Sequence, residues 1–118
     1  MPASPLEATS RPLGAQEIFR HQAPPPLRVE VPEVGGHVHV RVLSAGERAT
    51  LDFDSPDFAA RVTTLAACDE SGKRLFDDGA EKELAELEDG RVIFRVADAA
   101  VRHNALLKAD REEAAKNS

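Results

Sequence analysis

The chain has 118 residues, a formal net charge of −6 and 31% charged residues, enough for one domain with a modest core. The acidic balance argues against general nucleic-acid binding, and five Phe without Trp or Tyr leave few residues for stacking bases. No apolar run is long enough to cross a membrane, and because no basic region is followed by an apolar one near the N-terminus, no secretory signal is expected there. Because a single cysteine excludes an internal disulfide framework, we expect a cytoplasmic protein.

Residues 1–26 are expected to form a Pro-rich N-terminal tail. Residues 15–21 (AQEIFRH) predict a short helix whose only apolar anchors are Ile18 and Phe19. The APPP run before the next element imposes extended backbone and ends any helix, because proline lacks an N–H donor and restricts the residue before it.

The segment 27–42 predicts an antiparallel β-hairpin. Valine or leucine alternates with charged residues or histidine along both arms, which is the pattern of half-buried strands. A two-residue loop at Gly35 and Gly36 pairs Val31 with Val40 and places all the valines on one face. A hairpin is marginal alone, so this valine face is expected to cover the rest of the chain.

About four α-helices are predicted after the hairpin. Ser44 and Glu47 have the spacing of a capping box and begin the first helix, and Asp78 with Glu81 repeats that spacing before the third. A DESGK turn and an extended Leu-Phe pair lie between the second and third helices. The expected ranges are 44 to 51 or 53, 56–67, 80–87 (with Leu84 and Leu87 turned inward) and 91–108.

The helix predicted over 91–108 is apolar around most of its circumference. Phe94 and Val101 widen its apolar arc beyond an ordinary core stripe. Arg95, Asp98 and Arg102 form the charged face and are spaced to pair along the helix. Such a helix is either the central helix of the fold or is partly covered by another chain. The rest of the arc consists of Val92, Ile93, Val96, Ala97, Ala100 and Leu107.

Together these elements predict an α+β fold, with an N-terminal antiparallel β-hairpin packed on a cluster of about four α-helices and flexible termini. The hairpin-plus-helices domain is expected to span 27–108, and residues 109–118 are expected to form a charged C-terminal tail.

No group of residues has the pattern of a catalytic, cofactor or metal site. His37 and His39 share a strand face, but two ligands from one strand are too few to hold a metal. Cys68 and His103 as nucleophile and base would lack an orienting third group, so Cys68 is interpreted as a buried structural residue. We therefore expect a non-enzymatic protein without a cofactor.

Three motifs in succession resemble those of the tail assembly chaperones of long-tailed phages (siphoviruses). VEVPEVGGHVHVRVLSAGER is similar to the family's valine-rich strand, Pro-Glu-aromatic-Gly-Gly turn, second strand and Leu-Thr/Ser-x-x-Glu-Arg helix start, with Val34 in place of the aromatic residue. LAACDESGKRLFDD resembles its small-apolar run followed by Asp-Glu-x-Gly-Lys-x-Leu-Phe. VRHNALL resembles the Arg-Leu-Asn-x-Leu that closes its last helix. The resemblance covers residues 18–107.

The resemblance implies a chaperone that binds the long helical tape measure protein in the host cytoplasm, helps recruit tail tube subunits, and is absent from the finished particle. On this hypothesis Phe94 and Val101 are the partner-binding residues, which contact an amphipathic client helix. Self-association into oligomers is a further expectation, whereas nucleic-acid and membrane partners are not expected. Such proteins are often made in two lengths by ribosomal frameshifting, and residues 115–117 (AKN) are compatible with a slippery codon run.

Two other classes stay open. A small structural tail or head-completion component of a phage or phage-like particle would be found in purified particles, which a chaperone would not. An acidic regulatory or antitoxin-like binding module would be encoded beside a toxin or an operator.

Overall fold

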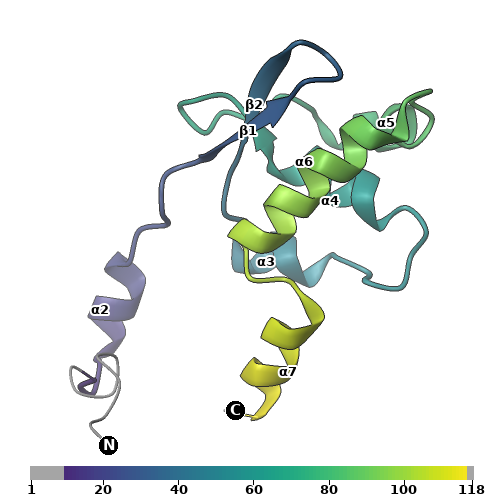
Figure 1. Cartoon of the computed structure of the whole chain (residues 1–118). Helices are drawn as coiled ribbons and strands as arrows, with labels where there is room; N and C mark the ends of the chain where they lie inside the picture. The colour runs from purple at the N-terminus through teal and green to yellow at the C-terminus, as the bar shows by residue number, and fades with distance from the viewer. Residues whose placement is uncertain (1–9, 117–118) are drawn as a thin grey trace, which may run out of the picture.

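The computed structural model describes residues 10–116 of the chain. In this part, three strands form an antiparallel sheet in the order β1-β2-β3, and helices pack against it (Figure 1). The α+β fold predicted from the sequence is therefore confirmed. The strands are β1 (Leu27–Val31), β2 (Gly36–Val40) and β3 (Ala67–Cys68). Alternation predicted the first two, but the two-residue β3 has no alternation that would reveal it.

The hairpin turn differs from the expected one. Val31 lies opposite Gly36, so the connection is the four residues Pro32–Gly35, and the Val31–Val40 pairing is wrong. The carbonyl of Val31 accepts from the N–H groups of the third and fourth residues after it at 3.0 and 3.1 Å, and Gly35 has a φ of 81°. Pro32 begins the turn, where its missing N–H is not needed. This register differs from the expected one by an even number of residues, so the valines still share a face.

The helices follow the predicted order with shifted bounds. Leu87 was expected to point inward, but α5 ends before it and its side chain is 43% exposed. Asp77, rather than Asp78, accepts the capping hydrogen bond, from the N–H of Gly79 at 3.0 Å. The elements are α2 (Ala15–Arg20), α3 (Ala45–Ala49), α4 (Phe58–Ala66), the 3₁₀ turn η1 (Asp78–Ala80), α5 (Glu81–Ala85), α6 (Gly90–His103) and α7 (Lys108–Lys116).

The core lies between the sheet and the pair α4–α6. The inward face of the hairpin supplies Val29, Val31 and Val40, which are buried against α4 and α6 residues such as Val62 and Val96. Helix α6 contacts α4, α5, β1 and β2, so it is the central helix, one of the two arrangements that its wide apolar arc allowed.

The end of α6 is the largest departure from the predicted helices. The helix was expected to reach Lys108, but the N–H of Leu106 binds the carbonyl of Val101 at 2.8 Å, and Ala105 adopts a φ of 53°. This is a Schellman ending with alanine where glycine is usual, so no residue type at this position indicates the end of the helix. Leu106 is buried in place of Leu107.

Helix α7 begins at Lys108 and lies mostly within the predicted charged C-terminal tail, where no helix was predicted. The guanidinium of Arg111 lies 3.9 Å from the ring centroid of Phe53, which holds α7 near the loop after α3. Residues 117 and 118 lie outside the described part, as do residues 1–9 of the predicted N-terminal tail.

Asn104 ties the end of α6 to the end of β2. Its side-chain carbonyl accepts from the N–H of Leu43 at 2.7 Å, and its side-chain amide donates to the carbonyls of Arg41 at 3.1 Å and Ala100 at 2.9 Å. Arg48 donates to the main-chain carbonyl of Asn104 at 2.6 Å. Because Asn104 is 3% exposed, these bonds replace those that it would make with water.

Glu47 extends this connection along α3. It accepts from the N–H of Ser44 at 2.9 Å while Ser44 accepts from its N–H at 3.1 Å, so the predicted capping box is present. Glu47 also forms a two-point ion pair with Arg41 at 3.0 and 2.5 Å. These contacts hold the pKa of Glu47 at about 2, and the Arg41 hydrogen bonds are the main cause. We call the group Arg41, Leu43, Glu47, Arg48 and Asn104 the Asn104 junction.

Candidate partner-binding site

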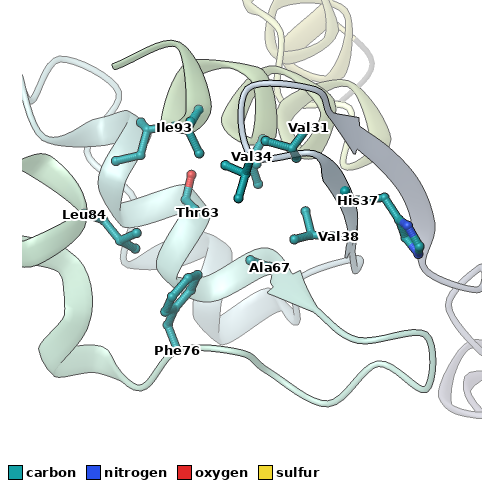
Figure 2. Close-up of a pocket in the computed structure, with 12 residues that line it drawn as sticks. Val31, Val34, His37, Val38, Thr63, Ala67, Phe76, Leu84 and Ile93 are labelled. Carbon is teal, nitrogen blue, oxygen red and sulfur yellow. The ribbon is translucent and has the colours of Figure 1, made fainter. Parts of the chain in front are cut away.

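An apolar hollow lies beneath the hairpin turn, at the other end of α6 from the Asn104 junction (Figure 2). Its volume is about 170 Å³. Val34, 71% exposed, and the exposed His37 stand at its mouth. We call it the hairpin hollow; its deeper lining includes Val31, Val38, Phe76, Leu84, Val92 and Ile93.

One polar group faces this hollow without a partner. The side chain of Thr63 on α4 is 3% exposed, and its hydroxyl has no hydrogen-bond partner among the described residues. The next residue, Thr64, is also buried, but its hydroxyl donates to the carbonyl of Ala60 at 2.7 Å. Figure 2 shows the Thr63 hydroxyl directed toward the hollow, on the side of Ile93 and Val34. A buried hydroxyl without a partner is destabilising, so it marks a place where a bound group could supply a bond.

An ion pair holds the hairpin turn over α6. Arg95 donates to both carboxylate oxygens of Glu33, at 2.8 and 2.6 Å, although Arg95 was expected to pair along its own helix. These hydrogen bonds lower the pKa of Glu33 below its ordinary value. Asp98 and Arg102 do pair along the helix, at 3.2 Å. The turn that carries Val34 is therefore fixed to the helix that forms the opposite wall of the hollow.

The sequence-predicted partner residues have different surroundings. Phe94 is 67% exposed and lies beside a second, smaller hollow of about 110 Å³ between α4, α5 and α6. The exposed Leu87 also lines this second hollow. Val101, in contrast, is only partly exposed and packs against the main core. We call Phe94, Leu87 and the hollow beside them the Phe94 patch.

One acidic residue lines the second hollow, and others are close to its lining residues in the sequence. Glu83, Glu86 and Glu88 are exposed on and just after α5, and Asp57 lines the second hollow from the start of α4. An acidic residue at the edge of an apolar hollow favours a partner that carries Lys or Arg beside its apolar residues.

The other candidate groups are the histidine pair on β2 and Cys68 on β3. The His37 and His39 rings lie 5.5 Å apart, and within residues 10–116 no set of three or more potential ligands gathers around a metal position. Burial raises the pKa of the Cys68 thiol, which disfavours the reactive thiolate. None of the hydrogen bonds among the described residues joins Cys68 to His103.

The structure reveals two features that the sequence interpretation missed, the hairpin hollow and the Asn104 junction. Thr63 gave a weak signal, because it is a polar residue inside the otherwise mainly apolar run 62–68. Asn104 belonged to a motif of the resemblance, but its partners lie about 60 residues earlier in the chain.

Comparisons of the chain with family models, with curated proteins and with solved structures gave no match. No helix within residues 10–116 combines the length and the apolar character needed to cross a membrane.

Proposed function

We propose that this protein is a phage tail assembly chaperone that binds the tape measure protein through the Phe94 patch and helps bring tail tube subunits to it. The single observation that carries the proposal is an aromatic side chain left 67% exposed beside an apolar hollow, on the central helix of the fold. A tape measure helix exposes an apolar face until the tube surrounds it, and a helix-in-groove contact would cover that face.

The contacts between the resemblance motifs support the proposal. The Leu-Ser-x-x-Glu-Arg segment and the Asn-x-Leu segment are far apart in sequence, yet Leu43 and Arg48 both bond to Asn104, at 2.7 and 2.6 Å. Residues with such contacts maintain the fold. This agrees with motifs that contain no catalytic signature and that would be shared because the fold is shared. Asp57 at the edge of the second hollow further suggests that the client segment is an amphipathic helix with a basic residue beside its apolar face.

Substitution of Phe94 by Asp tests the proposal. We expect the variant to keep its fold, because the ring is mostly exposed, and to lose roughly tenfold or more in affinity for the client. Far-ultraviolet circular dichroism measures whether the fold is kept. Co-purification with the tape measure protein, the long coiled-coil-rich protein expected to be encoded downstream, measures the affinity for the client. Leu75→Asp is the matched control, because Leu75 is also an exposed apolar residue but lies after the 69–73 turn.

Equal binding by the wild type and the Phe94→Asp variant would exclude the Phe94 patch as the client surface.

Gene order and particle composition test the proposed role in tail assembly. A tail tube gene upstream and a tape measure gene downstream are expected, and the protein should be absent from purified particles. Its presence there in stoichiometric amounts would instead favour a structural component.

A further inference from the structure

Helix α2 is exposed along its whole length. Its six residues are followed by the segment 21–26, and Figure 1 shows the helix standing apart from the sheet and from α4–α6. Phe19 is 81% exposed, and Leu13 and Ile18 are also largely exposed. Isolated helices shorter than about 12 residues are marginal in water, so a helix of this length needs a surface to pack on.

The hairpin hollow has the size and the apolar lining to receive the ring of Phe19. An apolar protein cavity of about 150 Å³ holds a benzene ring, and the hollow measures about 170 Å³. We propose that the α2 arm of one chain docks on the hairpin hollow of a second copy and inserts Phe19 past Val34. The last carbonyl groups of a helix have no donor within the helix, and at the end of α2 only that of Ile18 accepts from another described residue, the N–H of His21 at 3.2 Å. The other carbonyls there are acceptors of the kind that the Thr63 hydroxyl lacks.

The connection between α2 and β1 favours a second copy over the chain's own hollow. The arm leaves from Leu27, whereas the hollow lies at the Val31 and Val34 end of the hairpin. The segment 21–26 spans at most roughly 20 Å, and a return along β1 would use about 13 Å of it. That return also needs a chain reversal beside Pro24–Pro26, where the backbone is held extended.

Charge also favours contact between copies. Among residues 10–26, Arg11 and Arg20 outnumber the single acid Glu17, which gives this segment a net charge of +1, while the whole chain carries −6. The arm of one copy and the body of another therefore carry net charges of opposite sign, which attract each other. Two copies that exchange arms would close a two-fold dimer, and repetition of the contact in one direction would give a larger ring or an open chain of copies.

The test measures the mass of the full chain by sedimentation equilibrium over a roughly hundredfold range of concentration. The wild type is expected to exceed the 12.8 kDa monomer mass as concentration rises. Phe19→Asp removes the arm's anchor, and Val34→Asp places a charge at the mouth of the hollow. Each is expected to weaken association roughly tenfold to a hundredfold. Leu75→Asp, the matched control, should associate like the wild type.

Mixing the two variants sharpens the test. Phe19→Asp keeps an intact hollow and Val34→Asp keeps an intact arm, so an equimolar mixture is expected to form a one-to-one dimer that cannot grow further. The two substituted residues are 81% and 71% exposed, and circular dichroism should show both variants folded.

Three results would overturn the proposal: a wild type that stays monomeric throughout the range, variants that associate like the wild type, or a mixture that stays monomeric. A monomeric wild type that Phe19→Asp destabilises would place the arm on its own chain. The measurement uses no client, so its failure would leave the Phe94 patch to be judged by co-purification alone.

Discussion

The two ends of helix α6 are packed against the rest of the chain in different ways. At its C-terminal end, the side-chain amide of Asn104 uses both its carbonyl and its NH₂ group in bonds to Leu43, Arg41 and Ala100. At its N-terminal end, apolar side chains surround the hairpin hollow, and the hydroxyl of Thr63 has no partner among the described residues. The first end is tied to β2 and α3 by hydrogen bonds within the chain, although the Nε of Arg41 and the Nε2 of His103 also lack partners among the described residues. The second end leaves an apolar space unfilled.

This difference separates residues that maintain the fold from residues available to a partner. A buried hydrogen-bond network is costly to interrupt, because each remaining group keeps the cost of its lost hydration. An unfilled apolar space and an unpaired hydroxyl are costly already, so occupation of the space or removal of the hydroxyl can stabilise the protein. Substitutions at the two ends should therefore change stability in opposite directions.

The largest effect is expected for Asn104→Ala at the Asn104 junction. The change leaves the buried N–H of Leu43 without its acceptor and removes the donors to two carbonyls. We expect a loss of about 3 kcal/mol in the free energy of unfolding, measured by urea denaturation. Asp98→Ala on the same helix removes only an exposed ion pair to Arg102 and should cost less than about 0.5 kcal/mol. Equal losses of stability in the two variants would mean that the buried bonds of Asn104 contribute no more than an exposed ion pair.

Glu47→Gln should have the next largest effect. Because contacts with Arg41 lower the pKa of Glu47 from 4.5 to about 2 in the folded protein, the ionised carboxylate stabilises the fold. This contribution is fully present above pH 4.5 and is lost as the pH falls toward 2. Gln keeps the capping hydrogen bond but not the charge, so we expect a loss of about 2 kcal/mol at neutral pH.

The pH dependence provides the decisive measurement for Glu47. Urea denaturation at several pH values should show the difference between wild type and Glu47→Gln shrinking as the pH falls from 4.5 toward 2. Glu30→Gln is the control, because Glu30 pairs with Arg28 at 2.7 Å and both side chains are largely exposed. It should change stability by less than about 0.5 kcal/mol at any pH. A constant difference for Glu47→Gln would mean that its carboxylate charge contributes nothing.

Local patterns in the sequence predicted much of the fold. Alternation located β1 and β2, the Ser44–Glu47 spacing located the start of α3, and Asp69–Lys73 forms the expected turn, in which Gly72 has a φ of 90°. These features depend on residues within a few positions of one another. The register of the hairpin needed one more fact, that Pro32 begins a four-residue turn.

The candidate site was harder to predict, because it depends on contacts between distant segments. Phe94 and Val101 share a helical face, but only the placement of the neighbouring elements makes one exposed and the other partly buried. The end of α6 depends on the hydrogen bond between Asn104 and the N–H of Leu43, far away in the sequence. It also depends on Ala105, which adopts a left-handed conformation that its residue type disfavours. Periodicity along one helix contains none of this information.

The smallest expected effect has the opposite sign and concerns the open end. Thr63→Val replaces the unpaired hydroxyl by a methyl group of similar size, so we expect a gain of about 1 kcal/mol in the unfolding free energy of the monomer. Thr64→Val is the matched control on the same helix. Its hydroxyl is bonded to the carbonyl of Ala60, so its removal should give no gain and a loss of up to about 1 kcal/mol.

Urea denaturation of dilute samples, in which association is negligible, compares the two threonine variants. A gain for Thr63→Val with weaker association would mean that the hydroxyl of Thr63 acts in binding at the expense of monomer stability. A loss similar to that of Thr64→Val would mean that Thr63 already has a partner in solution, and the hairpin hollow would then be an ordinary packed surface. Because a binding role predicts that removal of this hydroxyl raises stability and weakens association, the pair of measurements separates a binding role from a packing role.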